Sequence, residues 1–199
     1  MLVHGWESNA ARWEPLLPHL LESGFSVVAL DAPAHGLSTG SELNLPFYAQ
    51  VISECIRMFN PSFLIGHSIG GAASLLSQYV SPASGLKKMV LLGAPSDMSI
   101  ILNNFHNILG LNRRSRSLLH QYFIDRFGNG IEAYTAKLHC RNISLPALVA
   151  HDLNDDVVLY DEAVKITSAW PHARLVTTRG LGHSMHDDGL YREVVNFLK

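Results

Sequence analysis

The sequence predicts an α/β fold in which helices flank a mostly parallel sheet, and two observations carry this prediction. Short apolar runs typical of strands alternate with helix-length amphipathic stretches along most of the 199 residues. One apolar run leads directly into a Gly-X-Ser-X-Gly turn at Gly66–Gly70, followed by small, helix-compatible residues. Ligands of such sheets bind beyond the carboxyl ends of the strands, so functional residues are expected there.

Each strand is predicted from a short apolar run. These runs lie at Met1–Val3, Phe25–Leu30, Ser62–Ile65, Lys88–Leu92, Ala147–Ala150 and Ala173–Thr177. Apolar side chains at helical spacing predict the helices between them. These helices lie near Trp13–Leu21, Phe47–Phe59, Gly70–Val80 and Glu162–Ala169, with a last one at Leu190–Lys199.

Residues 96–142 break this alternation, because they carry apolar positions at helical spacing and no strand pattern. Turn residues between 103 and 112 and between 128 and 130 divide the segment into two or three short helices. We therefore expect a core formed by residues 1–95 and 143–199, with a helical insertion at 96–142.

The composition favours small-molecule chemistry in one soluble domain. A formal net charge of -2 gives no reason to expect nucleic acid or an anionic membrane surface as partner. No apolar run reaches the roughly 18 to 20 residues of a membrane span. The two cysteines, Cys55 and Cys140, are too few for a disulfide framework and suit a reducing compartment. We therefore expect a cytoplasmic protein with a small-molecule substrate.

Ser68 is the candidate nucleophile. A serine at the centre of this turn occupies a strained strand-to-helix corner that exposes its hydroxyl above the sheet edge. The glycines two positions away on either side avoid Cβ clashes. The alternative is a glycine-rich turn with an inert serine. A nucleophilic serine also needs a base and a carboxylate that orients this base. Candidates follow two later strands, at His151–Val158 and Gly180–His186.

The order of these pieces resembles that of the α/β-hydrolase superfamily over nearly the whole chain. The similar segments are His4–Trp6, Asp31–Ser38, Gly66–Gly71, His151–Val158 and Gly180–His183. The resemblance implies an α/β-hydrolase fold with Ser68 as nucleophile and His183 as general base. Asp155 takes the acid position of the family's Gly-X-X-Asp step, and Asp152 stands where the glycine usually is. Asp156 and Asp152 are the alternative acids.

The resemblance also implies an oxyanion hole built from the backbone N–H groups of Trp6 and Ile69. Asp31–Ser38 is similar to a family loop, with Ala34 in place of the usual glycine, and we interpret it as structural. His35 braces that loop, and His67 lies on the far side of the serine turn. Neither is expected to act as a base.

A metal site is an alternative that the sequence raises, because His and Asp side chains cluster near two strand ends. They are His151, Asp152, Asp155, His183 and His186. Their spacing matches no known ligand pattern, and a metal would leave Ser68 without a use. Neither a metal nor a cofactor is therefore expected.

The start of the chain departs from the family pattern. The family normally supplies two strands and most of a third, roughly 25 to 60 residues, before the His-Gly step. Without them the strand at Phe25–Leu30 would be an exposed edge that invites pairing. We therefore expect either a fragment of a longer polypeptide or a protein that pairs through this edge, such as a homodimer.

These features predict a serine hydrolase, a carboxylesterase or thioesterase for a small acyl or aromatic substrate. The segment 96–142 lies where the family places the cap over its active site, which favours a substrate of modest size. Within it, Arg113, Arg114 and Arg116 either bind a substrate carboxylate or phosphate or form a solvated face. The alternative function is a non-catalytic or truncated α/β-hydrolase-like module that binds a ligand or partner.

Overall fold

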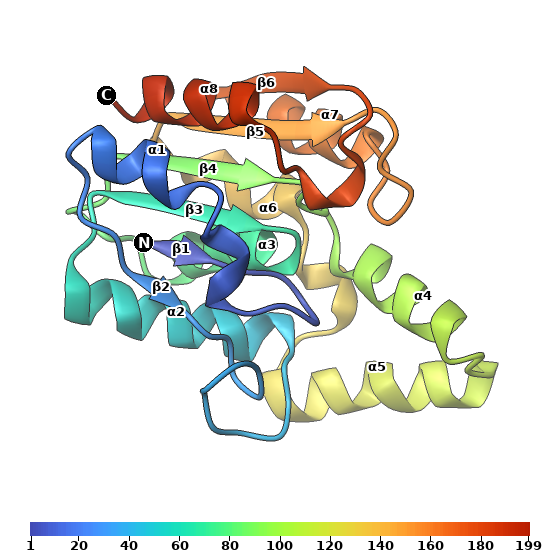
Figure 1. Ribbon diagram of the computed structural model, residues 1–199. Coiled ribbons are helices and arrows are strands. Elements are labelled where there is room, and N and C mark those ends of the chain that lie inside the picture. The colour runs from blue at the N-terminus through green and yellow to red at the C-terminus, as the bar shows by residue number, and fades with distance from the viewer.

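A single parallel sheet organises the protein. The computed structural model describes residues 1–199, and its six strands lie in the order β2-β1-β3-β4-β5-β6 (Figure 1). They are β1 (Leu2–Val3), β2 (Ala29–Leu30), β3 (Phe63–His67), β4 (Lys88–Leu92), β5 (Ala147–Asp152) and β6 (Ala173–Thr178). Because every pair is parallel, the carboxyl ends of all strands lie at one edge of the sheet. The predicted fold class is confirmed.

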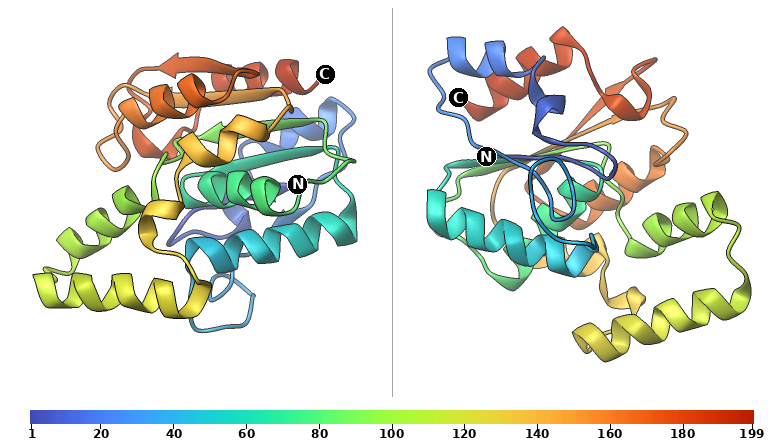
Figure 2. Two further views of the ribbon diagram at one scale, coloured as in Figure 1. Left: turned by 180° about the vertical axis from the view of Figure 1, so that it is seen from behind. Right: turned by 60° about the horizontal axis from the view of Figure 1, so that its bottom comes forward.

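Helices cover both faces of the sheet (Figures 1 and 2). One face carries α2 (Leu45–Phe59), α3 (Ile69–Val80) and α7 (Asp161–Ala169), and the other carries α1 (Leu17–Glu22) and α8 (Asp188–Leu198). Strand residues alternate between the two resulting cores, as the pleat of a strand requires. In β4, for example, Met89 and Leu91 pack under α2 and α3, whereas Val90 and Leu92 pack under α1 and α8.

Side-chain caps explain where two of the long helices begin. The Asn44 side chain accepts a hydrogen bond from the Phe47 amide at the start of α2 (3.0 Å), and Asp187 does the same for Leu190 at the start of α8 (2.8 Å). Each cap satisfies an amide that has no carbonyl partner within the helix. None of the helices is both long and apolar enough to cross a membrane.

Two predicted elements are shorter than expected. The strand expected at Phe25–Leu30 pairs only at β2, because the neighbouring β1 offers just two residues. The helix expected at Trp13–Leu21 is divided into the 3₁₀ turn η1 (Ala10–Trp13) and α1. Pro15 lies between them and lacks the N–H that would continue a helix, while Pro18 stands in the first turn of α1, where none is needed.

The chain between β4 and β5 is helical. It contains α4 (Met98–Ile108), α5 (Arg113–Phe127), η2 (Ile131–Ala133), α6 (Ala136–His139) and η3 (Cys140–Asn142). An isolated bridge between Asp97 and Thr135 closes the base of this segment. Beyond the bridge, α4 and α5 extend away from the sheet, as both figures show (Figures 1 and 2).

Candidate active site

Ser68 lies in the turn that joins β3 to α3. Its backbone has φ 53° and ψ -130°, a conformation that is costly for a residue other than glycine. A Cβ on Gly66 would lie 2.7 Å from the Gly71 Cα, and one on Gly70 would lie 2.3 Å from the His4 carbonyl oxygen. Only glycines therefore let strand, helix and the His4 segment approach this closely. The Gly-X-Ser-X-Gly pattern thus determines the shape of the turn.

Three of the predicted site residues are joined by hydrogen bonds. His183 follows β6 in the short turn η4 (Gly182–Ser184), and its Nε2 lies 3.0 Å from the Ser68 Oγ. Its Nδ1 lies 2.8 Å from Oδ2 of Asp155, in the loop after β5. An ionised carboxylate only accepts, so Nδ1 carries the proton and Nε2 is left to accept from the serine hydroxyl. The structure thus brings together side chains that 115 residues separate in sequence.

The Asp155 carboxylate is fully buried. Its Oδ1 accepts hydrogen bonds from the amides of Val157 and Val158, both at 2.9 Å, and the His151 Nε2 lies 3.3 Å from its Oδ2. Burial by itself raises the pKa of Asp155, but the hydrogen bonds from His151, His183 and Val158 outweigh it and hold the pKa below its ordinary value. Asp155 is therefore an anion at neutral pH, as an orienting acid must be.

The two alternative acids lie elsewhere. Asp156 is exposed on the surface of the loop. Asp152 is buried and joins the acid loop to the loop that carries His183. Its carboxylate accepts from the Thr178 hydroxyl and from the amides of Asn154, Gly180 and Leu181. Burial raises the pKa of Asp152, but hydrogen bonds that include those from Leu181, Thr178 and Asn154 lower it to about 2. Neither carboxylate bonds to His183.

Sequence reasoning missed the supporting roles of Asp152 and His151. His151 donates from Nε2 to the Val158 carbonyl (2.7 Å) and so holds the far side of the acid loop. Both residues end β5, and His151 lies four positions before Asp155. That spacing is the available signal in the sequence.

The other histidines near the serine turn make structural contacts. His67 donates from Nε2 to the backbone carbonyl of His183 (2.7 Å), and burial holds its pKa well below the ordinary value. It therefore supports the backbone of His183. His35 bonds only to backbone groups of its own and a neighbouring loop. His186 pairs with the Tyr191 hydroxyl, and no group of three or more His, Cys, Asp or Glu side chains is arranged to hold a metal ion.

Two backbone amides belong to segments that adjoin Ser68. The Ile69 amide begins α3, where an N–H has no partner within the helix. The Trp6 amide forms no hydrogen bond within the protein. It follows Gly5, which packs against Ser68 so tightly that a Cβ there would lie 3.0 Å from the Ser68 Cβ. Both predicted oxyanion-hole donors therefore belong to segments that flank Ser68.

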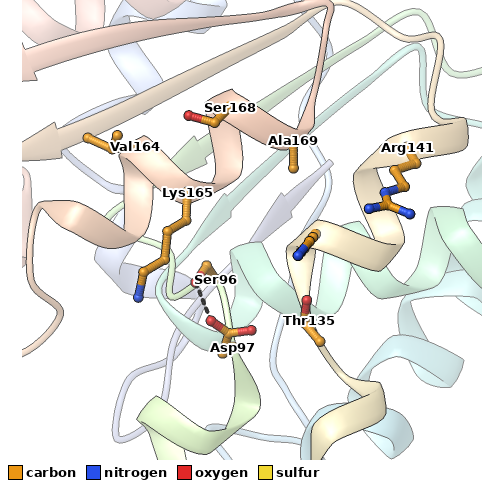
Figure 3. A pocket seen from close by; sticks show the side chains of 9 residues that line it. Ser96, Asp97, Thr135, Arg141, Val164, Lys165, Ser168 and Ala169 are labelled. Atoms are coloured by element: carbon orange, nitrogen blue, oxygen red, sulfur yellow. Dashed lines mark hydrogen bonds between the residues drawn. The ribbon is translucent and has the colours of Figure 1, made fainter.

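A cavity of about 530 Å³ lies apart from this site, beside α6 and α7 (Figure 3). Its lining contains none of the three hydrogen-bonded residues. The lining residues are Ser96, Asp97, Thr135, Lys137, Arg141, Val164, Lys165, Ser168 and Ala169. The Ser96 hydroxyl donates to the Asp97 carboxylate there (2.7 Å). The candidate active site thus rests on side-chain geometry at the carboxyl edge of the sheet and not on this cavity.

The protein is thus an α/β protein with a hydrogen-bonded Ser, His and Asp at the carboxyl edge of a parallel sheet. The model of the Alpha/beta hydrolase family matches residues 1–196, and the chain belongs to this family.

Individual relatives differ in how much of the chain they cover. The Serine hydrolase-like protein of Mus musculus is 33% identical over 121 residues, which span 58% of this chain but 38% of that protein. The Non-heme chloroperoxidase of Streptomyces lividans is 26% identical and covers 98% of this chain and 90% of its own length. The solved bromoperoxidase from Bacillus anthracis superposes with a TM-score of 0.75 at 17% identity, over 99% of this chain and 90% of that one.

Proposed function

We propose that this protein is a serine hydrolase that transfers acyl groups from esters or thioesters of small acyl or aromatic acids to water. The observation that carries the proposal is the pair of hydrogen bonds centred on His183, 3.0 Å to Ser68 and 2.8 Å to Asp155. They form the arrangement in which a weakly nucleophilic hydroxyl becomes reactive.

The first half of the proposed reaction forms an acyl-enzyme. The Ser68 Oγ attacks the substrate carbonyl carbon while His183 Nε2 takes the hydroxyl proton. The carbonyl oxygen becomes an anion that accepts hydrogen bonds from the amides of Trp6 and Ile69. Each such donor is worth about 3 kcal/mol of transition-state stabilisation. Asp155 stabilises the imidazolium. When the tetrahedral intermediate collapses, the bond from the carbonyl carbon to the leaving oxygen or sulfur breaks, and the imidazolium gives its proton to the departing alkoxide or thiolate, which leaves the acyl group on Ser68.

The second half releases the acid. A water molecule takes the place of the leaving group. His183 removes a proton from this water as the water oxygen attacks the carbonyl carbon of the acyl-Ser68 ester. The same two amides stabilise the second oxyanion. When this intermediate collapses, the bond to the serine oxygen breaks, and His183 returns the proton to Ser68. No cofactor takes part in either half.

An aromatic pair supports a small acyl group. The Trp6 ring packs against Phe105 of α4 in an edge-to-face arrangement, with 5.8 Å between the ring centres. Because Trp6 directly follows Gly5, which packs against Ser68, we propose that this pair bounds the acyl side of the site. Large side chains there limit the room for the acyl chain and suit flat or short groups.

Hydrolysis of a series of p-nitrophenyl esters of increasing acyl length tests the proposal. We expect short chains to be preferred over long ones by tenfold or more in kcat/KM, about 1.4 kcal/mol, and the activity to vanish in Ser68→Ala. A preference for long chains would contradict the small acyl group. If the folded protein hydrolyses no ester, the alternative of a non-catalytic binding module is supported instead.

A second candidate reaction uses the same acyl-enzyme. Similarity to the Non-heme chloroperoxidase over 98% of the chain favours hydrogen peroxide as an acceptor in place of water. With acetic acid as the acyl donor, Ser68 would form the acyl ester and release water. Attack by peroxide on this ester would release peracetic acid and regenerate the hydroxyl. Oxidation of bromide in acetate buffer with hydrogen peroxide, compared between the unaltered protein and Ser68→Ala, tests this reaction. Equal rates in both proteins would exclude it.

A further inference from the structure

The helices α4 and α5 form a hairpin, residues 98–127, which we call the arm. At its base, Asp97 and Thr135 pair with each other. The arm is attached to the body by Asn104 of α4, which donates to the Val157 carbonyl (2.6 Å), and by Tyr122 of α5, which donates to the Glu42 carboxylate (3.1 Å). The tip between these attachments, residues 107–116, extends away from the sheet (Figures 1 and 2). The tip is therefore the part of the arm that is free to meet another surface.

The arm concentrates positive charge. Residues 98–124 contain Arg113, Arg114 and Arg116 and no Asp or Glu, whereas the rest of the chain has 12 basic and 17 acidic residues. None of the three arginines forms an ion pair, and Arg116 contacts only the amide oxygen of Asn107 (3.4 Å). The overall net charge of -2, which argues against an anionic surface as partner, is thus an average over a basic tip and an acidic body.

Large aliphatic side chains are exposed beside these arginines. Ile108 and Leu109 at the end of α4 are 70% and 52% exposed, and Leu118, which follows the arginines on α5, is 63% exposed. Apolar side chains flanked by Arg are the combination that binds the boundary between lipid headgroups and acyl chains. The aliphatic groups enter the boundary, and the guanidinium groups pair with lipid phosphates.

We propose that the tip of the arm binds the surface of an anionic phospholipid bilayer. A second copy of this chain is a poorer partner, because a twofold contact between arms would place the two arginine clusters opposite each other. Single-stranded nucleic acid is also disfavoured, since its bases stack on aromatic rings, and the exposed apolar side chains of the tip are aliphatic. The proposal goes beyond the hydrolase activity and does not depend on it.

Flotation with lipid vesicles tests the proposal. The protein carries Ser68→Ala so that any lipid hydrolysis is prevented. One set of vesicles is phosphatidylcholine alone, and the other also contains roughly 30 mol % of the anionic lipid phosphatidylglycerol, both in about 0.1 M salt. We expect binding to the anionic vesicles only. Replacing the three arginines of the tip by glutamine should weaken it about 100-fold, or about 3 kcal/mol at 1.4 kcal/mol per tenfold change.

Two further variants make the test specific. Arg57, Lys87 and Arg192 are exposed on the body, so their joint replacement by glutamine removes the same charge elsewhere and should leave binding unchanged. Ile108→Ser with Leu109→Ser should weaken binding at least tenfold without altering the charge, and salt at about 1 M should abolish it. Circular dichroism confirms that each variant is folded.

Several results would overturn the proposal. The first is that the protein binds neutral and anionic vesicles equally well. The second is that the tip and body variants lose the same amount of vesicle binding, and the third is that the folded protein binds no vesicles. Dimers in light scattering that the tip variants abolish would assign the tip to a second copy. Because all binding is measured on the Ser68→Ala protein, absence of hydrolase activity in the unaltered protein would leave these outcomes unaffected.

Discussion

Replacement of Asp155 by asparagine keeps the shape of the side chain and exchanges one acceptor oxygen for a donor NH₂ group. The structure determines which one is exchanged. Two amides, those of Val157 and Val158, donate to Oδ1, so the asparagine must keep its oxygen there. Its NH₂ group then occupies the position of Oδ2 and donates to Nδ1 of His183. His183 is thereby forced to carry its proton on Nε2, where it can no longer accept from Ser68.

The wrong tautomer should lower kcat by about 10,000-fold, equivalent to about 5 kcal/mol of transition-state stabilisation. The assay is p-nitrophenyl acetate hydrolysis, with the rate of labelling by a fluorophosphonate as a second measure of Ser68 reactivity. Asp156→Asn is the matched control, because this neighbouring carboxylate is exposed, and it should retain full activity. A loss of less than tenfold in Asp155→Asn, or an equal loss in both variants, would refute the reasoning.

Three further predictions concern the framework of the site. Asp152→Asn places an NH₂ group among four donors, so at least one buried hydrogen bond is lost and we expect unfolding in urea to show a loss of about 1 to 3 kcal/mol. The pKa of Asp152 falls to about 2 on folding, so ionised Asp152 stabilises the fold above about pH 4, and this stabilisation disappears as the pH falls toward 2. Asp152→Asn should therefore lose less stability than the unaltered protein between about pH 4 and pH 2. An identical dependence of stability on pH in both proteins would contradict this. Gly70→Ala would force a Cβ to 2.3 Å from the His4 carbonyl, and we expect insoluble or inactive protein; an active variant with unchanged melting temperature would show that the turn can widen. Trp6→Ala and Phe105→Ala should shift the ester preference toward longer acyl chains, since both keep the Trp6 amide and enlarge the proposed acyl site; an unchanged preference would place the acyl group elsewhere.

Much of the architecture could be predicted from the sequence because the signals are local. The apolar run of β4 and the glycines around Ser68 are signals that extend over only a few residues, and the structure has β4 at the expected bounds. The loops after β5 and β6 were identified as carriers of Asp155 and His183, and the parallel topology brings these loops to the same edge as the serine turn.

Other features depend on contacts that no local pattern encodes. Asp152 occupies a position usually held by glycine, and its role follows from donors that lie 26 to 29 residues further along the chain. The direction of the arm depends equally on tertiary contacts, such as that between Tyr122 and Glu42, which are 80 residues apart. Helical spacing predicted the helices of this segment and could not predict that their tip extends from the body.

The central claim is that the hydroxyl of Ser68 is a nucleophile activated by His183. Mass spectrometry of the protein after exposure to a fluorophosphonate tests it most directly. We predict one adduct per chain, on the peptide that contains Ser68, and none in Ser68→Ala or His183→Ala. A folded protein that remains unmodified, or an adduct that persists in Ser68→Ala, would contradict the claim.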